Sequence, residues 1–191
     1  MTMKKTYWII ALIALFFAGD RLGGYLLEQL IAKSQFRYSR LYKGGAESDI
    51  LLVGNSRGLM FYQPYIESIT GKSTFNISYN GMPMNLARAL VEDYLDRYEA
   101  PELMILDITM CDRHNEGLIA GFNAYTSFSD RLEQLVDETN PRVGAAGKLS
   151  HLYRYNGEIF QRALYYLNKT DEDWLLDRVI TDDLVATVDA C

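Results

Sequence analysis

The sequence contains few histidines and few cysteines, and it has no net positive charge. Each of these features excludes a class of function. Any imidazole chemistry must come from His114 or His151, because the 191 residues include only two histidines. Cys111 and Cys191 are too few for a disulfide framework and lack the spacing of metal ligands. The formal net charge of −6 argues against a nucleic-acid partner. We therefore expect no metal, no bound cofactor and no nucleic-acid ligand.

The N-terminal segment contains an uninterrupted apolar run over residues 7–18, preceded by two lysines. This run is short for a bilayer span, which takes about 20 residues, and it matches the core of a signal peptide. Apolar residues continue beyond it at helical spacing, which predicts one helix over about residues 5–33 that projects from the body of the protein. We interpret residues 1–33 as an uncleaved signal anchor. A cleaved signal peptide and a buried helix of a soluble protein are the alternatives.

Basic residues lie on both sides of the apolar run, so the charge rule for membrane topology only weakly favours one orientation. That orientation gives a single-pass membrane protein with its amino terminus inside and its main domain on the periplasmic or extracytoplasmic side. The following segment, residues 34–48, is polar and basic and ends in Gly-Gly. We expect a solvated juxtamembrane linker there, followed by an α/β domain over residues 49–191.

The first half of this domain alternates between strand and helix signals. Three short apolar segments, residues 50–53, 74–78 and 103–108, have the composition of buried strands. Residues 86–98 carry leucine, valine and tyrosine on one helical face and charged residues on the other. Strands and helices alternating at this spacing predict parallel pairing with right-handed crossovers.

The second half is different, because no fourth buried strand follows. We expect irregular structure over residues 110–129 and helices over residues 130–136, 149–167 and 174–188. The lack of a fourth buried strand is the most informative feature of this half of the sequence.

The strongest local motif follows the first strand. Two residues, Gly54 and Asn55, separate Ser56 from the end of the strand. In open α/β sheets ligands bind outside the carboxyl ends of the strands, so a serine here is placed to act as a nucleophile if a base accepts its proton. The alternative is that Asn55 and Ser56 only cap the following helix.

Several segments together resemble the SGNH/GDSL hydrolase superfamily. They are Asp20-Arg21, the stretch from Asp49 to Arg57, Phe75-Asn76 leading to Gly81, the strand that ends at Asp107, and the stretch from Ser150 to Asn156. The similarity is to a membrane-anchored branch of bacterial envelopes, which includes proteins that work on O-acylation of surface polysaccharides. The resemblance implies a three-layer, flavodoxin-like parallel sheet with flanking helices.

The resemblance also implies roles for individual residues. Ser56 matches the nucleophile, and Gly81, in the Asn80-Gly81 turn, matches the glycine whose amide helps to form an oxyanion hole. Arg57 matches a recurrent arginine beside the site. The asparagine that completes the oxyanion hole has no direct match, and Asn115 is the nearest substitute. We expect Ser56 and Gly81 to converge at the carboxyl ends of adjacent strands.

The catalytic base is the main departure from the family. Members carry an Asp-x-x-His pair near the carboxyl end, and this chain has none. Asp112 precedes His114 by two residues instead of three, and Lys148 stands three residues before His151. His114 is the only local substitute as a base. A loop histidine bonded to its neighbours is the alternative interpretation.

Three hypotheses follow. The first is an envelope serine esterase or O-acyltransferase with an incomplete triad, acting on an acylated carbohydrate or a lipid-linked substrate. The second is a non-catalytic scaffold that binds glycan or partners a membrane-embedded acyltransferase. The third is a truncated gene fragment that has lost the end of the fold.

Overall fold

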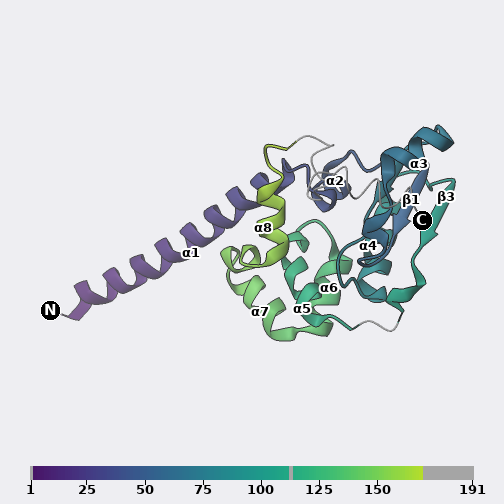
Figure 1. Cartoon of the computed structure of the whole chain (residues 1–191). Coiled ribbons are helices and arrows are strands. Elements are labelled where there is room, and N and C mark those ends of the chain that lie inside the picture. Colours follow the sequence, from purple (N-terminus) through teal and green to yellow (C-terminus); the bar gives the residue numbers. More distant parts are fainter. Residues whose placement is uncertain (1, 112–113, 170–191) are drawn as a thin grey trace, which may run out of the picture.

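The computed structural model describes residues 2–111 and 114–169, which form a mixed α/β body with one long helix projecting from it (Figure 1). The elements of the first half are α1 (Thr2–Ala32), α2 (Arg37–Lys43), β1 (Ile50–Val53), η1 (Gly58–Met60), α3 (Gln63–Thr70), β2 (Thr74–Asn76), α4 (Met84–Arg97) and β3 (Leu103–Leu106). Those of the second half are η2 (Ile108–Met110), α5 (Glu116–Gly121), η3 (Phe122–Tyr125), α6 (Asp130–Thr139), α7 (Pro141–Leu149), η4 (Leu152–Tyr155) and α8 (Glu158–Tyr165). The η elements are short 3₁₀ turns.

The described strands form one small parallel sheet in the order β2-β1-β3. Ile50 of β1 pairs with Thr74 of β2 on one side and with Leu103 of β3 on the other. Helix α4 joins β2 to β3, as the amphipathic pattern of residues 86–98 predicts. The predictions of three parallel strands and of this crossover helix are therefore confirmed.

The prediction that the third strand is buried is wrong. All four residues of β1 are buried, but Leu103, Met104 and Leu106 of β3 are 50%, 38% and 44% exposed. Within the described residues β3 pairs only with β1, and its other edge is open. An apolar run is typical of a strand covered on both faces, but here no described element covers β3 in that way.

Helix α1 is continuous, which confirms the predicted helix over residues 5–33. Its stretch Tyr7–Ala32 is long and apolar enough to cross a membrane, two properties that a signal sequence shares. Only the first part projects freely. The second part packs against the body, where Asp20 and Ile31 are almost completely buried (Figure 1).

Residues 34–48 are not a solvated linker but part of the core. Tyr38 and Leu41 of α2 have no exposed surface. The Tyr38 hydroxyl donates to the carbonyl of Ile77 at 3.1 Å, and the Tyr98 hydroxyl donates to the carbonyl of Leu41 at 2.9 Å. Tyrosine supplies a large apolar ring together with a hydroxyl that can find a partner, so a segment rich in tyrosine and serine can be buried without an orphaned polar group.

The segment expected to be irregular, residues 110–129, contains helical turns. Asn115 and Ser129 act as N-caps: the Asn115 side chain accepts from the amide of Leu118, and the Ser129 hydroxyl accepts from the amide of Leu132. These caps begin α5 and α6, because an N-cap oxygen satisfies an amide that has no partner within the helix. Helix α6 confirms the predicted helix over residues 130–136 and extends it to Thr139.

Two further predictions in the second half need correction. Helix α7 was not expected, because its Gly-Ala-Ala-Gly centre carries no apolar stripe; Gly144 and Gly147 are buried in it instead. The predicted helix over residues 149–167 is interrupted near Gly157, which separates the short turn η4 from α8. The predicted helix over residues 174–188 lies outside the described residues.

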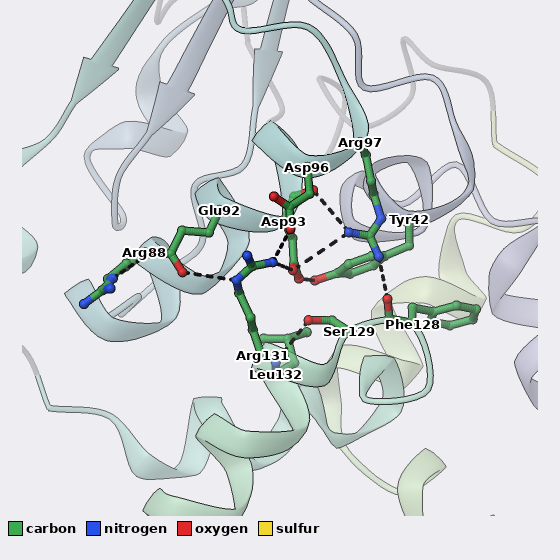
Figure 2. Close-up of polar contacts among 10 residues, drawn as sticks. All are labelled: Tyr42, Arg88, Glu92, Asp93, Asp96, Arg97, Phe128, Ser129, Arg131 and Leu132. Atoms are coloured by element: carbon green, nitrogen blue, oxygen red, sulfur yellow. Dashed lines mark hydrogen bonds and ion pairs between the residues drawn. The ribbon is translucent and has the colours of Figure 1, made fainter.

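A buried carboxylate joins α4 to its neighbours (Figure 2). Asp93 of α4 is 2% exposed and accepts a hydrogen bond from the Tyr42 hydroxyl of α2 at 2.7 Å. Arg131 of α6 approaches the same carboxylate at 3.2 Å, and Arg97 lies 3.8 Å from it. Burial and the adjacent Asp93 charge raise the pKa of Tyr42 well above its usual value, so Tyr42 stays neutral and donates.

We predict that Asp93→Ala lowers the free energy of unfolding by about 3 kcal/mol or more, because it leaves a buried hydroxyl and two arginines without their shared acceptor. Urea unfolding of the full chain in detergent micelles measures this loss. Asp96→Ala is the control, since Asp96 contacts the same Arg131 from a 56% exposed position and should cost less than about 1 kcal/mol. Equal losses in the two variants would contradict the central role of Asp93.

Candidate functional site

The exits of the three strands meet at the carboxyl edge of the sheet. The amide of Tyr79, beyond β2, donates to the carbonyl of Gly54, beyond β1, at 3.2 Å. A Cβ added to Gly54 would lie 2.8 Å from the Cβ of Asp107, which directly follows β3. Gly54 thus permits an approach that a larger residue would prevent, and turns from all three strands share one region.

Ser56 lies in the turn that leaves β1, and its side chain is exposed. The structural role in this turn belongs to Asn55, whose side-chain oxygen accepts from the amide of Arg57 at 3.1 Å. Among residues 2–111 and 114–169 no hydrogen bond of the Ser56 side chain is found, and η1 begins without a side-chain cap. Neither Asn55 nor Ser56 caps η1: Asn55 stabilises the turn through the Arg57 amide, and Ser56 is exposed.

Asn55 also connects the β1 turn to the exit of β3. Its side-chain amide donates to the Thr109 hydroxyl at 3.1 Å, and that hydroxyl donates to Asp107 at 2.7 Å. The Thr109 amide donates to the same carboxylate oxygen at 3.0 Å, which makes Asp107 the N-cap of η2. The other oxygen of Asp107 is buried without a partner among the described residues. The sequence analysis did not predict this series of hydrogen bonds. Its only signal in the sequence was an aspartate that directly ends an apolar strand.

Burial disfavours the ionised form of Asp107, but the hydrogen bonds from Thr109, with the nearby Arg57 charge, outweigh it and hold the pKa of Asp107 below its usual value. Arg57 itself is exposed. Beyond β2, burial and the adjacent Glu158 raise the pKa of Tyr79 to about 12. Its hydroxyl donates to the Glu158 carboxylate at 3.0 Å, which ties this turn to α8.

Gly81 and Asn115 lie in contact. Gly81 has a positive φ of 70°, and its carbonyl accepts from the Asn115 side-chain amide at 3.0 Å. Asn80, the other residue of this turn, is exposed. Ser56 and Gly81 each lie two residues beyond the bonded pair Gly54 and Tyr79. The structure thus brings Asn115 to Gly81 and places the turns that carry Ser56 and Gly81 side by side.

His114 does not complete a catalytic pair. It is exposed next to Asn115, and within the described ranges it makes no hydrogen bond to Ser56. Asp112 lies outside those ranges. The same part of the chain contains no group of histidine, cysteine, aspartate or glutamate side chains that could hold a metal ion.

Comparison with protein-family models, with curated proteins and with solved structures finds no match for the chain. The fold and the site therefore define a class only: a mixed α/β protein with a small parallel sheet, a long apolar N-terminal helix and a polar cluster at the carboxyl edge of its strands.

We predict that Gly81→Ala destabilises the protein by about 1 kcal/mol more than Gly71→Ala. Both glycines have φ near +70°, so both variants carry the strain of a left-handed backbone. A Cβ at Gly81 would in addition lie 2.8 Å from the Asn115 amide nitrogen, whereas a Cβ at Gly71 meets nothing within 4 Å. Thermal unfolding of both variants measures the difference, and equal losses would show that Asn115 is not held against Gly81.

The lowered pKa of Asp107 gives a second prediction. A carboxyl group whose pKa is lower in the folded state adds stability above its unfolded pKa of about 3.9, and this contribution is lost as the pH falls through the folded value. Asp107→Asn cannot titrate, so its stability should fall less than that of the wild type between pH 5 and pH 3. Urea midpoints across this range test the prediction. Parallel curves would mean that Asp107 has no net stabilisation from its hydrogen bonds.

Proposed function

We propose that this chain is a membrane-anchored, SGNH-like protein of the serine esterase and O-acyltransferase type, acting on acylated glycans of the cell envelope. Ser56 is the proposed acyl acceptor. The observation that carries this proposal is the exposed Ser56 hydroxyl, free of any structural hydrogen bond among the described residues, at the point where three strand exits meet. A serine in that position is available to an ester substrate.

Two further features support the same class. The strand order β2-β1-β3 is the order in which the first three strands of flavodoxin-like sheets are arranged, and ligands bind at their carboxyl edge. The Asn115 side-chain amide donates to the Gly81 carbonyl, so the glycine matched to the oxyanion hole and the nearest substitute for its asparagine are neighbours in space. Donors held in place before the reaction are commonly the largest contribution to acyl transfer.

Helix α1 supports the membrane anchor. It joins directly to the body, so an anchored α1 would hold the body at the extracytoplasmic face of the membrane. This position fits a substrate that is an acylated carbohydrate or is linked to a lipid. The proposal also includes the three-layer arrangement of the family. The described residues leave β3 uncovered, so they do not by themselves form three complete layers.

A second candidate, a non-catalytic scaffold, is favoured by one observation. No residue within the described ranges is hydrogen-bonded to Ser56 as a base. A general base contributes about 10²–10⁴-fold to rate, so a serine without one turns over slowly. The open, apolar β3 would then serve a partner, such as a membrane-embedded acyltransferase.

We predict that a fluorophosphonate probe labels Ser56 in the full-length chain, while hydrolysis of p-nitrophenyl acetate stays indistinguishable from that of Ser56→Ala. Oxyanion donors alone can leave residual reactivity at the serine, but no described residue is bonded to Ser56 as a base, so we expect no turnover. Mass spectrometry of the labelled peptide and initial rates in detergent micelles give the two readouts.

The matched control variants are Ser56→Ala and His114→Ala. No labelling of Ser56 would reject the acyl-acceptor role and leave the scaffold. Robust hydrolysis that is lost in both variants would instead establish a Ser56–His114 pair and show that the expected lack of turnover is wrong.

A further inference from the structure

The apolar run of α1 is too short to cross a bilayer by itself. Residues 7–18 rise about 18 Å along a helix, whereas the hydrocarbon core is about 30 Å thick. The span must therefore continue for about another 12 Å, to roughly Leu26 or Leu27, if Tyr7 lies at the far boundary. The next acidic residue along α1 after Asp20 is Glu28, which fits a boundary at this level.

A span of this length contains the Asp20-Arg21 pair, and charged residues at such a depth need partners. The body of the protein supplies them. The Asp20 carboxylate accepts from the Ser150 hydroxyl at 2.5 Å and from the amides of His151 and Leu152 at 2.8 and 3.2 Å. Arg21 lies 3.1 Å from Asp20 and also donates to the carbonyl of Leu149 at 3.3 Å. The residues that bond to Asp20 and Arg21 must therefore lie at the same depth in the membrane as these two charges.

The two sides of α1 differ at this level. One stripe faces the body and contains Asp20, Gly24 and Ile31, all buried. The other side carries Leu22 and Leu26, which are 62% and 55% exposed and continue the apolar surface of the first part of the helix.

The segment that receives Asp20 is also apolar on its outer side. Residues 149–153, which join α7 to η4, are called the η4 corner below. Within the η4 corner Leu149 is 66% exposed, Leu152 is 44% exposed and Tyr153 is 37% exposed. Figure 1 shows this part of the body lying nearest to the projecting half of α1.

We propose that the η4 corner is embedded in the membrane, with Leu149, Leu152 and Tyr153 at the boundary between headgroups and acyl chains. This inference rests on the membrane-anchoring part of the proposed function. The occupant of the surface is the lipid bilayer, because the exposed side chains continue the apolar face of a helix that crosses it. Tyrosine is typical of this boundary, since its ring is apolar and its hydroxyl reaches water. The body is thus seated in the membrane surface, and α1 is not a flexible tether.

The close packing of α1 on the η4 corner provides a selective way to separate the two. A Cβ at Gly24 would overlap the Cβ of His151, whereas a Cβ at Gly19 would meet nothing within 4 Å. Gly24→Leu and Gly19→Leu therefore add the same apolar side chain to the same helix. Only the first of them forces the η4 corner away from α1.

The test places an environment-sensitive NBD fluorophore on a single cysteine in full-length protein reconstituted into vesicles, with Cys111→Ser and Cys191→Ser as the background. The fluorophore is attached through Leu149→Cys or, as the control, through Ile69→Cys on α3, which is equally exposed at 65% and far from α1 (Figure 1). We expect a several-fold increase in emission with quenching by doxyl-labelled lipids at position 149, and neither effect at position 69.

Gly24→Leu should abolish the signal at position 149, and Gly19→Leu should preserve it. Alkaline carbonate extraction tests the membrane anchor separately from the embedded η4 corner. If carbonate retains the protein but position 149 behaves like position 69, or keeps its lipid signal in Gly24→Leu, then the embedded corner is overturned and the anchor stands. If carbonate releases the protein, the anchor and the embedded corner are both overturned.

Discussion

The position of α2 between the sheet and the helical half is the constraint on which the remaining structure depends. Its Tyr38 hydroxyl holds the exit of β2 through Ile77, and Arg37 donates to the carbonyl of Ser78 at 2.5 Å. On its other side the Ser39 hydroxyl lies 2.6 Å from that of Tyr125. The course of the β2 exit, and hence the position of the turn that carries Gly81, follows from where α2 is held.

Tyrosine makes this arrangement stable. The rings of Tyr38, Tyr42 and Tyr125 exclude water, while each hydroxyl finds an acceptor or a donor across an element boundary. A polar group that is buried with a partner costs little, and one that is buried alone costs about 1–3 kcal/mol. Because each hydroxyl must meet its partner, these contacts specify one packing among the many that an aliphatic core would allow.

The sequence predicted the sheet because short apolar runs and the stripe of α4 have a simple periodicity. The sequence did not predict α2. A segment rich in tyrosine and serine has the composition of a polar linker, and its burial becomes clear only when the partners of the hydroxyl groups are known. The sequence also did not predict α7, where buried glycines replace an apolar stripe. The open face of β3 could not be foreseen, because an apolar strand is the same in sequence whether or not a neighbour covers it.

In the candidate site, the turn around Ser56 could be predicted from the sequence, but the contacts between segments far apart in the sequence could not. The strand, glycine and serine around Ser56 lie within a few residues, so their geometry follows from the turn. The contact between Asn115 and Gly81 joins segments 34 residues apart, and only the resemblance to a family suggested it. The hydrogen bonds that link Asn55, Thr109 and Asp107 had only the strand-ending aspartate as a sequence signal, because hydrogen bonds between strand exits depend on strand order.

The central place of β1 has a consequence for biosynthesis. This strand is the first to be made, but it lies between two strands that come later, and the last of them ends about 55 residues further on. At the usual rates of translation the ribosome needs about 3–11 s to reach that point. During this interval the Ile-Leu-Leu-Val segment is without its β3 neighbour. The nascent chain therefore presents an apolar strand before its neighbours have been made, and a chaperone that binds extended apolar peptides would act on it at this stage.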